Sequence, residues 1–192
     1  MNISCERPSL LYRLIDELGN NRVFSVIYKK HISKLGLKGN EVILDFGSGS
    51  GAGSRHLAKK LYRFNGYLTC VDISEYWMEK ARRRMKHYDN VDFLVGELPR
   101  LQLGVQSFDI IYIFYALHDV SKDLRSGIVS EFFEILKNEG RLIIKEPQRE
   151  NDGMPIEEIE ELMKNSGFYR ENYKVDKGTY SAIYKKTVCD IL

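Results

Sequence analysis

Apolar and polar residues along the chain follow two alternating patterns. Short runs rich in β-branched and aromatic residues are typical of buried strands, and the segments between them repeat apolar residues at helical spacing. The predicted strands are residues 42–46, 67–71, 91–95, 108–114 and 141–145, and the predicted helices are residues 53–62, 75–87, 124–136 and 155–165. Residues 169–175 and 179–185 are predicted to form a hairpin over Lys177-Gly178.

This alternation predicts an α/β fold. We expect a doubly wound, seven-stranded, mostly parallel sheet with an antiparallel strand in the C-terminal hairpin and helices on both faces. Two further helices, around Leu10–Leu18 and Val23–Leu35, precede the first strand. We therefore expect a single domain over residues 1–192, in which residues 1–40 form an N-terminal helical cap and residues 41–192 form a Rossmann-like core.

The composition and net charge of the chain exclude several classes of protein. Apolar residues make up 43% of the 192 residues and charged residues 29%, which excludes a disordered or collagen-like chain. The net charge of +2 gives no argument for nucleic acid or an anionic membrane as a partner, and the basic runs at Lys59-Lys60 and Arg82–Arg84 are interpreted as solvated helix faces. Three scattered cysteines, no metal-ligand spacing and no signal peptide or membrane span favour a cytoplasmic protein without a metal.

A glycine-rich stretch, VILDFGSGSGAG, runs from Val42 to Gly53. Its glycines allow left-handed backbone and let a ligand approach the main chain, at the sheet edge where ligands bind in such folds. Asp45, just before the loop, would repel a pyrophosphate and attract an ammonium or sulfonium group. The stretch therefore favours a positively charged ligand. The alternative for Asp45 is a strand-end carboxylate that bonds loop amides.

A second acidic residue, Asp72 in the stretch CVDIS, closes the second predicted strand. A carboxylate at this place can accept hydrogen bonds from both hydroxyls of a ribose. The alternative is a helix N-cap, a role that Ser74 fits better.

At these residues the chain resembles the class I, Rossmann-like S-adenosylmethionine-dependent methyltransferases, over roughly residues 36–186. VILDFGSGSG resembles the first motif of that family, VDIS the second, VDFLVGELPRL the third, FDIIYIFYALHDV the fourth strand with its loop, and LKNEGRLIIKEP the fifth-strand motif. The resemblance departs from the family at Asn138-Glu139-Gly140, where Pro-Gly-Gly is commoner, and at Phe114, where many relatives carry Asn.

The resemblance implies S-adenosyl-L-methionine as the cofactor. Ile73 would pack on the adenine ring, and Trp77 would cover it unless Trp77 is ordinary core packing. The implied cofactor-binding residues are Asp45, Gly47, Ser48, Gly49, Gly51, Asp72, Ile73, Trp77, Gly96, Glu97, Leu98 and Phe114.

Three candidate catalytic residues follow the fourth and fifth predicted strands: Tyr115, His118 and Glu146. His118 has an intrinsic pKa suited to proton transfer, and its alternative is a loop histidine packed on the sheet rim. Tyr115 is alternatively a core residue, and Glu146 a cap of the polar loop that follows it. Asp119 is interpreted as the cap of the next helix.

These features predict an S-adenosylmethionine-dependent methyltransferase of the small-molecule, quinone-biosynthesis-like branch, with no nucleic acid or membrane partner. The acceptor pocket would come from the N-terminal helices and the loop before Pro155, or from a second subunit of a homodimer. The alternatives are an RNA or protein methyltransferase of the same fold, and a non-catalytic cofactor-binding relative that serves as a partner subunit or sensor. A nicotinamide oxidoreductase is disfavoured by Asp45 and the closing hairpin.

Overall fold

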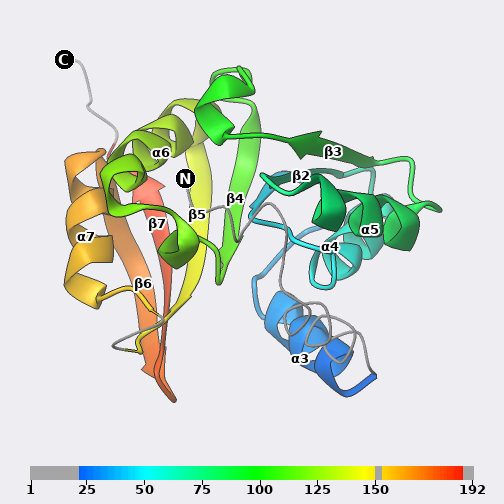
Figure 1. Cartoon of the computed structure of the whole chain (residues 1–192), viewed down its shortest axis with the longest axis horizontal. Helices are drawn as coiled ribbons and strands as arrows, with labels where there is room; N and C mark the ends of the chain where they lie inside the picture. Colours follow the sequence, from blue (N-terminus) through cyan, green and yellow to red (C-terminus); the bar gives the residue numbers. More distant parts are fainter. Residues whose placement is uncertain (1–21, 150–152, 188–192) are drawn as a thin grey trace. The chain divides into compact units, whose positions relative to one another are not determined.

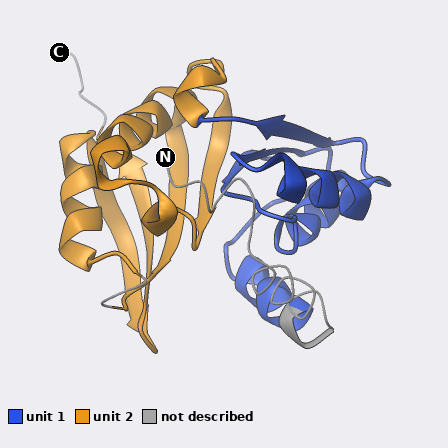
Figure 2. Cartoon of the chain, in the orientation of Figure 1, with its two compact units in different colours: residues 1–97 blue, residues 98–192 orange. Residues whose placement is uncertain are grey.

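The computed structural model describes residues 22–149 and 153–187. They belong to two compact units, residues 1–97 and residues 98–192 (Figure 2). The helix predicted around Leu10–Leu18 lies outside the described residues.

The first unit carries three parallel strands and three described helices (Figure 1). Its elements are α3 (Arg22–Ser33), β1 (Val42–Phe46), α4 (Ser54–Tyr62), β2 (Tyr67–Asp72), α5 (Glu75–Met85) and β3 (Val91–Val95). β2 lies between the other two strands, and its register pairs Asp45 of β1 with Cys70. The predicted inward face of α4, at Leu57, Ala58 and Leu61, is fully buried. These contacts fix the start of α4, and with it the glycine loop, against the carboxyl end of β1.

The second unit carries four strands and two α-helices. Its elements are η1 (Leu98–Arg100), β4 (Phe108–Phe114), η2 (Leu117–Asp119), α6 (Lys122–Ile135), β5 (Leu136–Pro147), α7 (Ile156–Asn165), β6 (Phe168–Asp176) and β7 (Thr179–Lys186). β4 and β5 are parallel, and β7 runs antiparallel to both β5 and β6. Lys177 and Gly178 both have positive φ, 48° and 73°, as the predicted two-residue hairpin turn requires.

The seven strands have the order β3-β2-β1-β4-β5-β7-β6. The predicted doubly wound, mostly parallel sheet with one antiparallel strand in the closing hairpin is therefore confirmed. The carboxyl ends of β1 and β2 carry the glycine loop and Asp72, and those of β4 and β5 carry the candidate catalytic residues. No helix among the described residues is long and apolar enough to cross a membrane.

The start of β5 and the cap of α6 differ from the prediction. β5 begins at Leu136 instead of Arg141, because Leu136 turns into extended backbone directly after α6 and pairs with Phe108 of β4. The N-cap of α6 is Ser121, and Asp119 lies two residues earlier, at the end of η2. The interpretation of Asp119 as the helix cap is therefore wrong.

Candidate cofactor site and catalytic cluster

The glycine loop after β1 is held in left-handed backbone. Gly47, Gly49 and Gly51 have φ of 68°, 52° and 76°. Two of these glycines differ in their surroundings. A Cβ on Gly51 would meet Met85 and Ala81 of α5 at 2.8 and 3.1 Å, so this glycine allows close packing. A Cβ on Gly49 would meet nothing within 4 Å, so open space lies beside the main chain there.

Asp72 connects the glycine loop to the turn after β2. Its Oδ2 accepts a hydrogen bond from the Gly49 amide at 2.8 Å, and its Oδ1 accepts one from the Ser74 amide at 2.9 Å. Ser74 itself is the N-cap of α5, with its hydroxyl accepting from the Trp77 amide. Asp72 is therefore not the helix cap. Its carboxylate is fixed at the end of β2 by two backbone donors, and a carboxylate oxygen can accept more than one hydrogen bond.

Asp45 is buried behind the glycine loop and accepts a hydrogen bond of 2.5 Å from the Ser54 hydroxyl at the start of α4. The pKa of Asp45 is raised to about 7, chiefly by burial; the Ser54 hydrogen bond lowers it, and the nearby Asp72 adds a smaller upward shift. The alternative, in which the Asp45 carboxylate bonds amides of the loop, is wrong, because its partner is the Ser54 hydroxyl. A cation close to the two carboxylates would relieve this unfavourable burial of charge.

The remaining candidates of the first unit lie next to Asp72. Ile73 is 37% exposed although it is aliphatic, so its side chain is accessible to a ligand ring. Trp77 is half-buried, edge-on to Tyr76 with ring centroids 5.0 Å apart. The Gly96 amide donates to the Asp72 carbonyl at 3.0 Å, and Glu97 after it is half-buried. Exposed apolar surface, an anchored carboxylate and open space at Gly49 are the features that an adenosine-bearing cation requires, so these residues fit S-adenosylmethionine.

Two cofactor candidates belong to the second unit. Leu98 is 1% exposed, so its side chain packs inside that unit and only its main chain can contact a ligand. The half-buried Phe114 ring lies 4.5 Å from the Tyr115 ring, with the Lys145 ammonium within 6 Å of both centroids, at 5.5 and 5.7 Å. Tyr115 has a left-handed φ of 55° and is 37% exposed, so its alternative as a core residue is wrong. A non-glycine residue in this conformation costs about 1 kcal/mol or more, and such residues cluster at functional sites.

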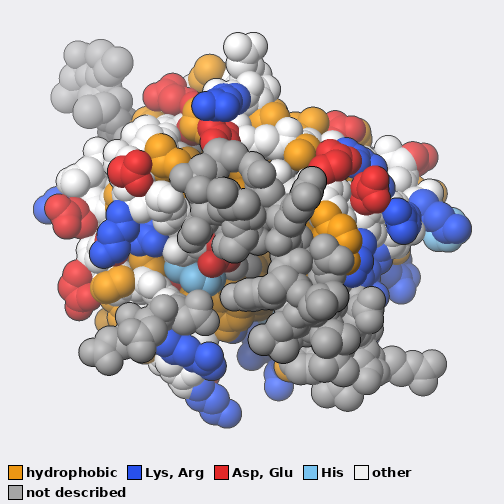
Figure 3. All heavy atoms as spheres, viewed as in Figure 1, with side chains coloured by type: hydrophobic (Ala, Val, Ile, Leu, Met, Phe, Trp, Pro, Cys, Tyr) orange, Lys and Arg blue, Asp and Glu red, His pale blue; other side chains and the backbone are white. Residues whose placement is uncertain are grey.

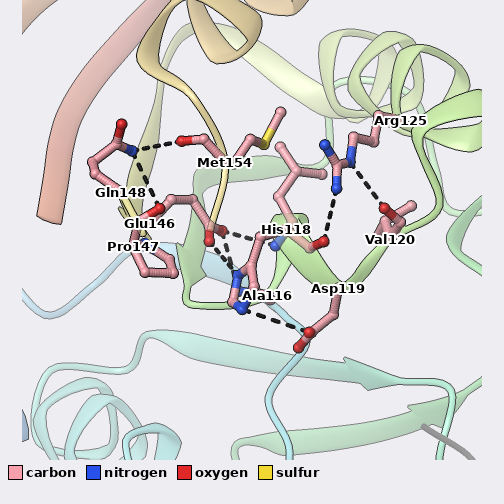
Figure 4. Close-up of polar contacts among 10 residues, drawn as sticks. Ala116, His118, Asp119, Val120, Arg125, Glu146, Pro147, Gln148 and Met154 are labelled. Carbon is pink, nitrogen blue, oxygen red and sulfur yellow. Dashed lines mark hydrogen bonds and ion pairs between the residues drawn. The ribbon is translucent and has the colours of Figure 1, made fainter. Parts of the chain in front are cut away.

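Glu146 and His118 form a buried cluster at the ends of β5 and β4 (Figure 4). Glu146 is fully buried, and its Oε1 accepts hydrogen bonds from the amides of Ala116 and Leu117 at 3.1 and 2.8 Å. Its Oε2 lies 2.6 Å from His118 Nδ1, and His118 Nε2 lies 3.5 Å from Asp119 Oδ1. Glu146 thus anchors the turn after β4, not the loop that follows β5.

Arg125 completes this cluster and was not singled out from the sequence. The side chain donates to the carbonyls of His118 and Val120 at 2.7 and 2.9 Å and pairs with Glu158 of α7. Its 5% exposure results in part from a partner 33 residues away. Glu146 from one side and Arg125 from the other therefore hold the His118 turn rigidly.

We expect Glu146→Gln to lower the free energy of unfolding by about 1–2 kcal/mol. The variant keeps an oxygen for the two amides, but its NH2 group lies beside His118 Nδ1. The imidazole then has to move its proton to Nε2 so that Nδ1 can accept a hydrogen bond. Chemical denaturation of the wild type, both single variants and the Glu146→Gln/His118→Ala double variant measures this. If the coupling between the two positions is below about 0.5 kcal/mol, the ring and the carboxylate are not interacting as described.

The described residues contain no group of three or more His, Cys, Asp or Glu side chains placed to hold a metal ion. Cys70, in β2, is a buried free thiol, and burial raises its pKa well above the ordinary value.

The strand order, the glycine loop and the acid at the end of β2 define the class I fold of S-adenosylmethionine-dependent methyltransferases. The family model for the methyltransferase domain matches residues 43–140, about half of the chain, and the chain belongs to this family. In agreement with the fold, it is similar to the crystal structure of a SAM-dependent methyltransferase from Aquifex aeolicus, with a TM-score of 0.73, 22% identity and coverage of 90% of this chain and 96% of that one.

Curated relatives are similar over part of their length. Demethylmenaquinone methyltransferase of Tropheryma whipplei (strain Twist) is 33% identical over 114 residues, which are 58% of this chain and 44% of that protein. The enzyme of the same name from Clavibacter sepedonicus is 30% identical over 129 residues, 67% of this chain and 49% of that protein. The chain thus spans about half the length of these relatives.

Proposed function

We propose that this chain is a methyltransferase that moves the methyl group of S-adenosylmethionine to a small-molecule acceptor. The observation that carries the proposal is the anchored Asp72 carboxylate beside the open left-handed glycine loop. The family supports it, as do relatives named for demethylmenaquinone, sterol and phosphoethanolamine acceptors.

Residues of the first unit would hold the cofactor, and Leu98 and Phe114 are further candidates for contact with it. Asp72 would accept hydrogen bonds from the ribose hydroxyls, Ile73 and Trp77 would contact the adenine, and Gly96 and Glu97 would border it. Asp45 and the loop Gly47–Gly51 would face the charged methionine end. When bound, S-adenosylmethionine supplies an electrophilic methyl on a cationic sulfur.

His118 would remove the acceptor proton where the acceptor must lose one. The Glu146 carboxylate holds Nδ1 as the donor, which leaves Nε2 as the basic atom. Tyr115, exposed and fixed by its left-handed backbone, would contact the acceptor. Glu146 would act through His118 and not touch the substrate, since it is fully buried. The buried free Cys70 supports a reducing, cytoplasmic location. We also propose a homodimer, in which a second subunit would complete the acceptor pocket.

Calorimetry with S-adenosylhomocysteine and with NADH tests the cofactor class. We expect binding of the first in the micromolar range, about −8 kcal/mol, and none of the second. Incubation with methyl-labelled S-adenosylmethionine and fractionated extract should then label the small-molecule fraction. Label in the RNA or protein fraction would contradict the proposed acceptor class. Tight binding without any label would contradict methyl transfer, in a family where one relative is named an S-adenosyl-L-methionine-dependent Diels-Alderase.

A further inference from the structure

A groove lies within the first unit, along the outer side of α4. It has a volume of about 780 Å³ and is lined by residues from one side of α3, by α4 and by the end of α5. This volume is typical of sites for small organic ligands. The glycine loop and Asp72 do not line it.

The groove is strongly cationic. Its described lining residues include no Asp or Glu, and six of them are Lys29, Arg55, Lys59, Lys60, Arg63 and Arg84. Lys and Arg side chains gather at the right-hand side of the space-filling view, over α4 and α5 (Figure 3). The excess belongs to this half of the chain, because residues 1–97 contain 16 Lys and Arg against 11 Asp and Glu, whereas residues 98–192 contain 13 against 16. The groove therefore has a local charge that the net +2 of the chain conceals.

Five of these six cations have no counter-ion or side-chain hydrogen-bond partner among the residues that the structure describes. Arg84 bonds the carbonyl and hydroxyl of Ser50, but the other five form no ion pair or side-chain hydrogen bond within the described residues. Arg82 and Arg83 on the outer side of α5, by contrast, pair with Glu75 and Glu79. Arg82 and Arg83 thus pair with nearby carboxylates, whereas the described lining of the groove contains no carboxylate.

Two further observations point into the groove. Nε of Arg55 is buried and has no hydrogen-bond partner among the described residues, and a buried guanidinium donor without an acceptor is unfavourable. Burial lowers the pKa of His56, and the charges of Arg55, Lys29 and Lys59 lower it further, so these cations act on one small region. Both features would be relieved by an anion.

The wall of the groove is not wholly polar. Phe64, directly after the C-terminal end of α4, is 56% exposed, and Tyr88 lies at the same groove. Aromatic rings beside cations suit a ligand that combines phosphates with a flat or apolar group. A single monophosphate would leave most of the five cations without a partner.

We propose that this groove is a binding site for an organic polyphosphate of nucleotide size, separate from the cofactor site. Its phosphates would lie along Arg55, Lys59 and Arg63, which follow one another at four-residue spacing along α4 and its C-cap. The aromatic or apolar part would contact Phe64.

Calorimetry with inorganic pyrophosphate and with ADP tests this site. We expect both to bind, ADP more tightly, and the Lys59→Ala/Arg63→Ala variant to weaken both at least ~10-fold, since charge-assisted hydrogen bonds are lost. Phe64→Ala should weaken ADP alone. The matched control Arg83→Ala/Lys86→Ala removes the same charge from exposed positions outside the groove and should leave both affinities within about twofold.

Several outcomes would overturn the proposal. Absence of binding by both probes would make the groove an ordinary solvated surface. If the control variant weakened binding of the two probes as much as Lys59→Ala/Arg63→Ala does, the loss of affinity would be due to net charge and not to the groove. Displacement by saturating S-adenosylhomocysteine would put the probes in the cofactor site. Tighter binding of a single-stranded oligonucleotide with increasing length, or binding only to vesicles with anionic headgroups, would assign the groove to a nucleic acid or to a membrane surface instead.

Discussion

Replacing Asp72 by alanine is expected to weaken the binding of S-adenosylhomocysteine ~100-fold or more. In the proposed complex the carboxylate accepts two charge-assisted hydrogen bonds from the ribose, and each such bond contributes about 1.5–3 kcal/mol. The substitution also removes the acceptor of the Gly49 and Ser74 amides, so the glycine loop loses its fixed position. Titration calorimetry of the purified variant measures the affinity.

The Asp72 experiment has a natural control at Asp92, an exposed aspartate on the neighbouring strand β3. Asp92→Ala changes the net charge equally and should leave the affinity unchanged. Asp72→Asn keeps one oxygen for a backbone donor, so it should preserve the thermal midpoint better than Asp72→Ala while still losing most of the affinity. Wild-type affinity in a folded Asp72→Ala variant would remove the proposed role of this residue.

The helices and strands could be predicted from the sequence where the residues of a segment determine its conformation by themselves. Residues 91–95 and 108–114 are strands with the predicted bounds, because β-branched and aromatic residues favour a strand. The start of β5 could not be predicted, since Lys137, Asn138 and Glu139 have the composition of a turn. Their extended backbone is imposed by the pairing of Leu136 with β4, a contact with a distant part of the chain.

The candidate site shows the same division. The positive φ of the three glycines is local, and the glycine-rich motif predicts it, whereas the Gly49 partner of Asp72 lies 23 residues away in the sequence. The Ser54 partner of Asp45 and the Glu158 partner of Arg125 become visible only when α4 and α7 are in place. Lys59-Lys60 is the clearest case. The pair was interpreted as a solvated helix face, and only the fold adds the side chains of α3 and α5 that turn this face into a cationic groove.

Asp45→Asn is expected to stabilise the protein and weaken its cofactor binding at the same time. The folded-state pKa of about 7 lies above the ordinary value of 3.8, so the folded protein holds a proton on Asp45 that the unfolded chain releases. Wild-type stability therefore falls between about pH 4 and pH 7, and the full penalty, at most about 4 kcal/mol, is present above pH 7. Asparagine can still accept the Ser54 hydrogen bond and carries no charge to bury.

The stability difference between wild type and Asp45→Asn should accordingly be near zero at pH 4 and largest at pH 8, as chemical denaturation at both pH values would measure. Calorimetry should show the opposite effect on binding. Affinity of the wild type for S-adenosylmethionine should rise from pH 6 to pH 8 as Asp45 ionises, and the variant should lack this rise and bind ~10-fold more weakly at pH 8. The neutral sulfur of S-adenosylhomocysteine provides the comparison. If Asp45 acts on the sulfonium, the variant loses affinity mainly for S-adenosylmethionine, and if it acts on the ammonium, both ligands weaken equally. A variant that loses affinity for neither ligand would show that the buried charge serves no cationic ligand, and Asp45 would then be a residue of the β1–α4 junction alone.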